Sequence, residues 1–167
     1  MNPKVSVIMP SFNSSKYIRE AVSSVLNQSY VELELLIIDA GSTDGTVELI
    51  KQFSADDNRV KYIDNVDDEG PAHARQVGIQ YSEGNYIAFL DADDYWLPDK
   101  VEKQINFMQE KDINFSYTCY RSIDENGSNL SCPILMRDSY NLKQALVGRG
   151  IGILTIMIEK SLLNDEI

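Results

Sequence analysis

The sequence has few of the residues that mark several common classes of protein. Its two cysteines, Cys119 and Cys132, lie far apart without C-x-x-C spacing, and it has one histidine, so neither a zinc site nor a redox motif is indicated. No apolar run approaches the length of a membrane span. Basic residues number 15 against 26 acidic ones, and this net charge of −11 argues against nonspecific binding to nucleic acid or to an anionic membrane.

Two common phosphate-binding motifs are also absent. There is no G-x-x-x-x-G-K-[ST] loop and no G-x-G-x-x-G after a predicted strand, which argues against Walker-type and dinucleotide-binding domains. The 167 residues, 43 % hydrophobic and 25 % charged, suit one globular domain. The N-terminus enters a strand without a visible signal peptide, so we expect a cytoplasmic protein, with peripheral attachment to the inner face of a membrane as a further option.

Short apolar segments alternate with amphipathic ones, which predicts an α/β fold with a mainly parallel, Rossmann-like sheet flanked by helices. Pro10 is expected to end the first strand, because proline cannot continue a central strand. Ala74, Val77 and Tyr81 are expected to be the buried positions of the third helix, and Pro98 is expected in the first turn of the fourth. The predicted strands are 5–9, 34–39, 60–63, 86–90, 114–120 and 153–158, with a turn at 124–127; the predicted helices are 16–28, one opening after 39–46, 72–81, one after 91–94, 142–147 and one starting at 160–163.

Three carboxylates follow the strand predicted at 86–90. Asp91, Asp93 and Asp94 repel one another, so a bound cation is the simplest way to hold them together. A solvated acidic turn that caps the next helix is the alternative, and for an isolated D-x-D-D it would be favoured.

Two other strand ends are expected at the same edge of the sheet. Segments 10–13 and 39–45 follow parallel strands, and the carboxyl ends of such strands form one ligand-binding crevice. Asp39 could accept a hydrogen bond from a base or a ribose, while other carboxylates hold Mg²⁺ or Mn²⁺ together with diphosphate oxygens. This arrangement predicts a nucleotide-diphosphate site.

Four segments in this order resemble the family 2 glycosyltransferases, which have the GT-A fold. The resemblance implies a metal-dependent, inverting transfer from a nucleotide-sugar donor, with UDP-sugars favoured and GDP- or dTDP-sugars as options. It also implies a saccharide or lipid-linked acceptor, as in polysaccharide or glycoconjugate biosynthesis. The segments are VSVIMPSFN (5–13), LIIDAGSTDGT (36–46), ARQVGI (74–79) and GNYIAFLDADD (84–94).

The resemblance also assigns roles on the nucleotide side. Pro10, Phe12 and Asn13 would line the nucleotide, with Phe12 at a position where the family usually has tyrosine. Asp39 falls in the base-binding loop. Ala40 follows it where the family often has a second acid, so a uracil contact from that acid is missing.

The remaining assignments concern the diphosphate and the chemistry. Asp91 would face the ribose or the donor sugar, and Asp93 would hold the divalent metal. Arg75 could either neutralise phosphate or pair with an acid of the loop. The family's catalytic carboxylate belongs to a motif expected beyond Ile167, so we expect a single GT-A domain over 1–167, incomplete at its C-terminus, that contains the donor half of the site.

Three further expectations stay open at this stage. A nucleotide-sugar-binding fragment without transfer is the main alternative function, and a sugar nucleotidylyltransferase is disfavoured because no glycine-rich basic loop follows the first strand. His73 is expected to be a surface or loop contact rather than a catalyst. Trp96 with Tyr95 could wall the acceptor side or anchor the loop on the core.

Overall fold

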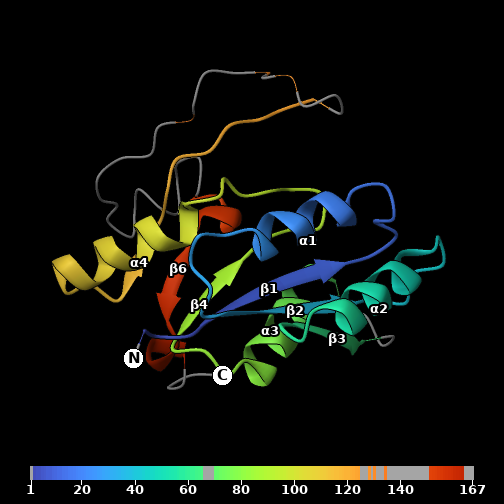
Figure 1. The fold of residues 1–167 in the computed structure, drawn as a ribbon, viewed down its shortest axis with the longest axis horizontal. Helices are drawn as coiled ribbons and strands as arrows, with labels where there is room; N and C mark the ends of the chain where they lie inside the picture. The colour runs from blue at the N-terminus through green and yellow to red at the C-terminus, as the bar shows by residue number, and fades with distance from the viewer. Residues whose placement is uncertain are drawn as a thin grey trace.

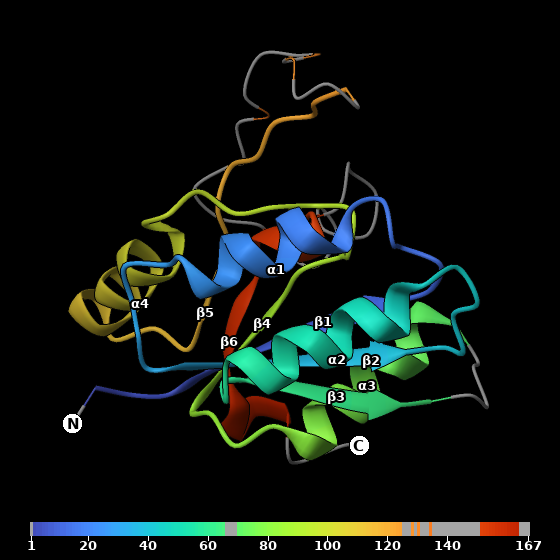
Figure 2. The ribbon, with the colours of Figure 1, turned by 45° about the vertical axis from the view of Figure 1, so that its right-hand side comes forward.

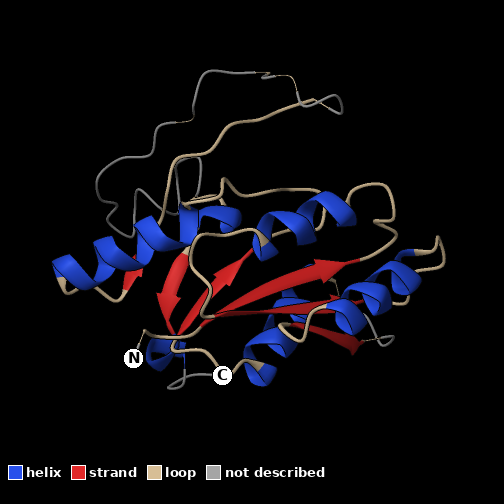
Figure 3. Cartoon of the chain, viewed as in Figure 1, coloured by secondary structure: helices blue, strands red, loops and turns tan. Residues whose placement is uncertain are grey.

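The computed structural model describes residues 2–65, 70–124, 128, 130, 134 and 151–163. Strands and helices alternate along this part of the chain, with helices on both sides of one sheet (Figures 1 and 3). In chain order the elements are β1 (Val5–Ser11), α1 (Ile18–Leu26), β2 (Leu33–Asp39), α2 (Thr46–Asp56), β3 (Val60–Asp64), α3 (Pro71–Tyr81), β4 (Tyr86–Phe89), α4 (Lys100–Lys111), β5 (Phe115–Ser116), η1 (Ile153–Thr155), β6 (Met157–Glu159) and η2 (Lys160–Leu163).

The sheet has the strand order β3-β2-β1-β4-β6-β5. The pairs β3–β2, β2–β1 and β1–β4 are parallel, whereas β6 pairs antiparallel with both β4 and β5. The mainly parallel α/β fold predicted from the sequence is therefore confirmed. None of the helices in the described part of the chain has the length and apolar character needed to span a bilayer.

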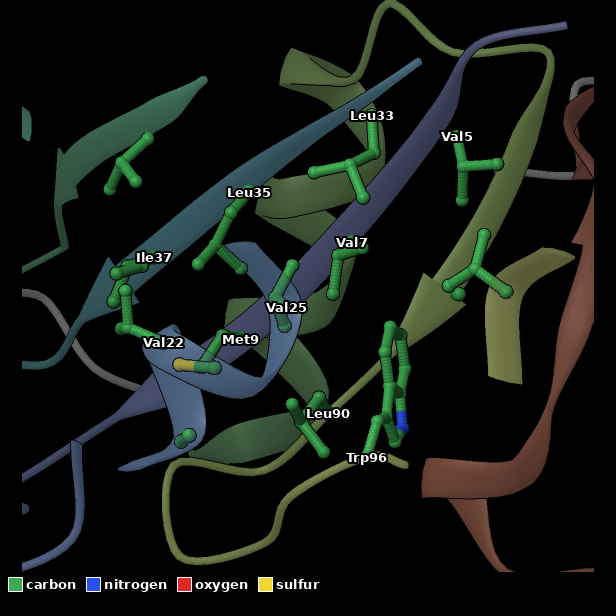
Figure 4. Packing of buried hydrophobic residues seen from close by; sticks show 14 of the residues in the cluster. Val5, Val7, Met9, Val22, Val25, Leu33, Leu35, Ile37, Leu90 and Trp96 are labelled. Carbon is green, nitrogen blue, oxygen red and sulfur yellow. The ribbon is translucent and has the colours of Figure 1, made fainter. Parts of the chain in front are cut away.

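Alternate residues of β1 divide the core between the two faces of the sheet. Val5, Val7 and Met9 pack with α1, α2 and α4 around Trp96 (Figure 4). Ile8 faces the other side, where α3 covers the sheet (Figure 2). This alternation is the period of two that a strand buried on both faces requires.

Pro10 lies inside a central strand, so the prediction that it ends β1 is wrong. The carbonyl of Ile8 accepts from Leu90 of the β4 side, and Pro10, two residues later, faces that same side. Pairing between β1 and β4 stops at Ile8 and Phe89, so the missing N–H falls where no ladder bond is made. Pairing with β2 continues to Ser11.

Helix α3 packs against the sheet differently from the prediction. Ala74 and Gly78 are its buried residues, Val77 is half-buried, and Tyr81 is exposed. A Cβ atom at Gly78 would lie only 2.4 Å from Cγ2 of Ile8, so glycine lets the helix approach the strand closely. The small face of α3, not its aromatic residue, therefore contacts the sheet.

The later elements are shorter than predicted. Only Phe115–Ser116 of the strand predicted at 114–120 is a strand, and 153–158 divides into η1 and the start of β6. Pro98 precedes α4, whose N-cap is Asp99. The helix predicted at 142–147, most of the turn at 124–127 and Cys132 lie outside the described residues, while Cys119 is exposed.

Candidate donor site

A pocket of about 440 Å³ lies at the carboxyl end of the parallel strands. The loop after β1, the start of α3 and the loop after β4 all contribute to its wall. Of the seven residues that sequence analysis assigned to the donor, all except Asp39 line this pocket. They are Pro10, Phe12, Asn13, Arg75, Asp91 and Asp93.

The loop after β1 holds Phe12 toward solvent at the pocket. Asn13 has a left-handed backbone (φ 47°), a conformation that asparagine tolerates better than most residues. Its N–H donates to Ser42 Oγ (2.8 Å), and its Oδ1 accepts from the Thr43 N–H (2.9 Å). The Phe12 side chain is 60 % exposed, so its ring is available to stack on a planar ligand.

Asp39 is fully buried beneath the pocket and orders the loop that follows β2. Its two carboxylate oxygens accept from the Ser42 N–H (2.8 Å) and the Ser42 hydroxyl (2.7 Å). Ala40, the next residue, lines the pocket. In this structure the Asp39 carboxylate orders the loop. Its contact with a nucleotide stays a prediction.

Asp44 lies just before the start of α2 and accepts hydrogen bonds from the first residue of this helix. It accepts from the Thr46 N–H (3.1 Å) and the Thr46 hydroxyl, and from the Ser15 N–H (3.0 Å). The bond from the Thr46 hydroxyl is the main cause that lowers the pKa of Asp44. The Asp44 bond to Ser15 ties the β2–α2 loop to the loop after β1, so the two walls of the pocket are held together.

The loop after β4 carries three carboxylates and one ion pair. The loop turns tightly, with the Asp94 N–H donating to the Asp91 carbonyl (3.0 Å). Arg75 Nη2 of α3 donates to Asp91 Oδ1 at 2.6 Å, so in this structure Arg75 pairs with an acid of the loop. Arg75 Nε is buried and has no hydrogen-bond partner within the described residues.

Asp94 experiences the uncompensated charge of this loop. Burial first, and then the negative charges of Asp93 and Asp91, raise the pKa of Asp94 to about 6. A divalent cation would relieve this repulsion, and carboxylate oxygens are the ligands that Mg²⁺ and Mn²⁺ prefer. The loop therefore fits such a metal.

The protein alone does not complete a metal site. In the residues that the structure describes, no group of three or more His, Cys, Asp or Glu side chains is arranged to hold an ion. A site of one or two carboxylates needs further oxygens, and a ligand's diphosphate is the usual source for Mg²⁺.

Sequence analysis gave no role to Lys100, the first residue of α4. Its ammonium lies 3.8 Å from the centre of the Trp96 ring. Trp96 is buried in the core, with Nε1 donating to the Leu154 carbonyl (3.0 Å), so it anchors the loop. The sequence did contain a sign that Lys100 points toward the core. Its spacing places it on the same face of α4 as the buried Gln104 and Met108.

Comparisons with known proteins identify the family. A family model described as "Glycosyl transferase family 2" matches residues 6–156. The Bacillus subtilis protein TuaG, a teichuronic acid biosynthesis glycosyltransferase by name, is 40 % identical over 158 residues, which are 95 % of this chain and 63 % of that protein. The Escherichia coli protein WfgD, named UDP-Glc:alpha-D-GlcNAc-diphosphoundecaprenol beta-1,3-glucosyltransferase, is 39 % identical over 160 residues, which are 96 % of this chain and 62 % of that protein.

A solved structure agrees with these matches. The crystal structure of S. aureus TarS 1-349 in complex with UDP superposes with a TM-score of 0.77 at 25 % identity and covers 97 % of this chain and 48 % of that chain. The fold is GT-A, and the chain spans a little under two thirds of the length of TuaG and WfgD. The chain therefore belongs to glycosyl transferase family 2.

Proposed function

We propose that this chain forms the donor-binding part of a metal-dependent, inverting glycosyltransferase. The donor is a nucleoside-diphosphate sugar, and the acceptor is a saccharide or a lipid-linked sugar. One observation carries the proposal: the pocket has the exposed ring of Phe12 on one wall and the acidic loop at Asp91 and Asp93 on another. A planar base and a metal-bound diphosphate are complementary to these two walls.

Each wall has a separate task in this proposal. Phe12 stacks on the base, and Pro10 and Asn13 shape the nucleotide wall. Asp93 holds the metal on the diphosphate, and Asp91, oriented by its 2.6 Å bond to Arg75, faces the ribose or the donor sugar. The buried Nε of Arg75 leaves its guanidinium able to donate to a phosphate oxygen as well.

When bound, the metal neutralises charge that develops on the diphosphate leaving group. The protein's own residues orient the donor and hold the sugar toward the acceptor, which lowers the barrier by positioning. The general base that activates the acceptor hydroxyl is assigned to no residue of this chain, so we propose transfer for the whole protein and donor binding for residues 1–167.

The relatives favour one donor class and one kind of acceptor. TarS was solved with UDP, and the name of WfgD specifies UDP-Glc and a diphosphoundecaprenol-linked acceptor. We therefore favour a UDP-sugar over a GDP- or dTDP-sugar, although Ala40 replaces an acid that the family often has next to Asp39. A lipid-linked acceptor would place the reaction at the cytoplasmic face of a membrane.

Calorimetry of UDP binding with and without Mn²⁺ tests the proposal. We expect Mn²⁺ to strengthen UDP binding to the wild type, and we expect Asp93→Ala to abolish that metal-dependent gain while the protein stays folded. Asp56→Ala is the matched control, because Asp56 is an exposed aspartate at the end of α2, outside the pocket. Unchanged metal-dependent affinity in folded Asp93→Ala would refute the metal assignment.

A parallel experiment separates transfer from binding alone. Titration with GDP and dTDP shows which nucleoside diphosphate the chain binds most tightly. Donor turnover is then compared between this chain and the full-length protein. Donor binding by both with turnover by neither would favour the binding function over the transferase.

A further inference from the structure

A second pocket, of about 700 Å³, adjoins the donor pocket. Its wall comprises the loop after β4, the start of α4 and the segment 118–123. Asp93 lines both pockets, so the two pockets meet at the proposed metal ligand. On the proposed function, this is the place from which an acceptor would approach the donor sugar.

Lys100 is an unpartnered cation in the wall of this pocket. Its ammonium nitrogen is buried and has no hydrogen-bond partner within the described residues, and its one recorded contact is the Trp96 ring. Burial lowers the pKa of Lys100 to about 7. An ammonium that is buried without an anionic partner is costly, so this position favours an incoming negative charge.

Lys103, one turn later in α4, differs from Lys100 because it has an acidic partner. Lys103 Nζ pairs with Asp99 at 2.5 Å one turn earlier, and its side chain is 73 % exposed. Asp99 is therefore occupied by Lys103 and does not neutralise Lys100. The other two acids of the lining, Asp93 and Asp94, belong to the proposed metal loop.

Other residues complete a surface for a charged sugar. The same lining holds two further cations, Lys103 and Arg121, and Arg121 is exposed and forms no ion pair with any described residue. Tyr120 and Leu154 supply an apolar wall of the kind on which sugar rings pack. The Trp96 ring, which the Lys100 ammonium contacts, is fixed by the hydrogen bond from its Nε1 to the Leu154 carbonyl (3.0 Å). The ammonium is therefore held at this wall.

We propose that the second pocket binds the acceptor and that Lys100, assisted by Arg121, receives an oxyanion that the acceptor sugar carries. The oxyanion is a sugar phosphate or a sugar carboxylate, which share the negatively charged oxygens that an ammonium binds. The proposal rests on the proposed function, because it takes the donor pocket to be filled by a nucleotide. It adds a substrate class, an anionic acceptor, and a specificity residue.

Calorimetry with three small sugars tests this site in the protein saturated with UDP and Mg²⁺. The probes are glucose 1-phosphate, glucuronate and glucose, which carry a phosphate, a carboxylate and no charge. Trp96 is the only tryptophan of the sequence, so its fluorescence gives a second readout at Lys100 itself. We expect at least one anionic sugar to bind and to change this fluorescence, and glucose to do neither.

Substitutions locate the binding at Lys100. Lys100→Met retains the length of the side chain and removes its charge, and we expect it to weaken anionic-sugar binding by about tenfold or more. Lys100→Arg keeps the charge and should retain most of the affinity. Lys111→Met, at the other end of α4 and outside the pocket lining, is the matched control and should bind like the wild type, and all three variants should bind UDP as the wild type does.

The outcomes are distinct. Binding of the phosphate alone, or of the carboxylate alone, identifies the source of the oxyanion. The proposal is overturned if neither anionic sugar binds, if glucose binds equally well, or if Lys100→Met binds as tightly as the wild type. Failure of UDP to bind the wild type would instead refute the donor site, and the same three sugars would then be titrated without nucleotide.

Discussion

The two ends of the sheet carry charge clusters of opposite character. At the amino ends of the strands, Glu34 is buried, and its Oε1 accepts from Ser6 Oγ (2.6 Å) and the Glu83 N–H (2.7 Å). Its Oε2 accepts no well-angled hydrogen bond but lies 3.0 Å from Lys4 Nζ and 2.9 Å from Lys61 Nζ. Every charge of this cluster therefore has a partner of opposite sign.

At the carboxyl ends the balance is reversed. Within the part of the chain that the structure describes, Asp91, Asp93 and Asp94 share one ion pair, that of Asp91 with Arg75. The pKa values of Glu34 and Asp94 differ in the same way. Although burial opposes it, the Ser6 hydroxyl, the Lys61 ammonium, the Glu83 N–H and the Lys4 ammonium lower the pKa of Glu34 to about 2, whereas burial and like charges raise that of Asp94 to about 6.

The difference distinguishes a cluster whose charges are paired within the fold from one that we propose to be completed by a ligand. A carboxylate with a complete set of partners gains nothing from a further cation. A carboxylate whose pKa is raised by burial and by nearby negative charges is stabilised in its ionised form by a cation, and such groups concentrate at functional sites. The comparison therefore predicts opposite consequences for removing a carboxylate at the two ends.

Removing the carboxylate at the saturated end should have the largest effect. Glu34→Ala leaves Lys4 and Lys61 without their buried partner and Ser6 Oγ without its acceptor. Lys4 and Lys61 keep Glu83, but Ser6 Oγ and the Glu83 N–H lose their acceptor, and unsatisfied buried donors cost about 1–3 kcal/mol each, about 4 kcal/mol together. We expect the free energy of unfolding, measured by urea denaturation at pH 7, to fall by about this amount.

Glu83→Ala is the control for this experiment. Glu83 contacts the same two lysines, but its side chain is 61 % exposed and its N–H remains in place to donate to Glu34. We expect a much smaller loss, since exposed pairs contribute little. Equal losses in the two variants would contradict the view that Glu34 is the centre of the cluster.

The second prediction concerns pH. The folded pKa of Glu34, about 2, is below its ordinary value of 4.5, so its contribution is complete above pH 4.5 and is lost as pH falls toward 2. A shift of this size corresponds to about 3 kcal/mol. Urea denaturation of the wild type and Glu34→Gln between pH 5 and pH 2 isolates the effect.

Other carboxylates titrate in the same range, but they do so in both proteins. We therefore expect the difference in unfolding free energy between wild type and Glu34→Gln to shrink steadily across this window. A difference that does not change with pH would show that Glu34 has no unusual affinity for its proton.

The contrast between the two ends could be predicted only in part from the sequence. Local patterns gave the four parallel strands and most of α1 to α4, because buried strands and amphipathic helices follow the period of their own residues. The strand ends at 10–13 and 91–94 followed from the rule for parallel sheets. The resemblance then singled out six residues, and the charge of Arg75 added a seventh; six of the seven line one pocket.

Partnerships across long separations were missed. Glu34 meets Ser6, 28 residues before it, and the Glu83 N–H, 49 residues after it, and no local pattern announces either contact. Asp39 differs, because its partner Ser42 is only three residues away and accounts for both of its oxygens. Its predicted contact with a nucleotide stays a prediction.

The smallest expected effect, with the opposite sign, comes from the acidic loop. The folded pKa of Asp94 is above its ordinary value of 3.8, so its ionised form destabilises the fold at pH 7. Because the side chain is partly exposed, solvent screening reduces the cost to about 1 kcal/mol. In EDTA, Asp94→Asn should therefore raise the free energy of unfolding by about 1 kcal/mol, while the control Asp56→Asn should leave it unchanged.

Adding Mg²⁺ with UDP should erase this advantage, because the cation then neutralises the loop of the wild type and stabilises it by mass action. Urea denaturation of the three proteins under both conditions provides the measurement. If Asp94→Asn were less stable than the wild type in EDTA, the Asp94 carboxylate would have a favourable partner within the fold. The carboxyl end of the sheet would then be saturated like the amino end, and the distinction between the two clusters would fail.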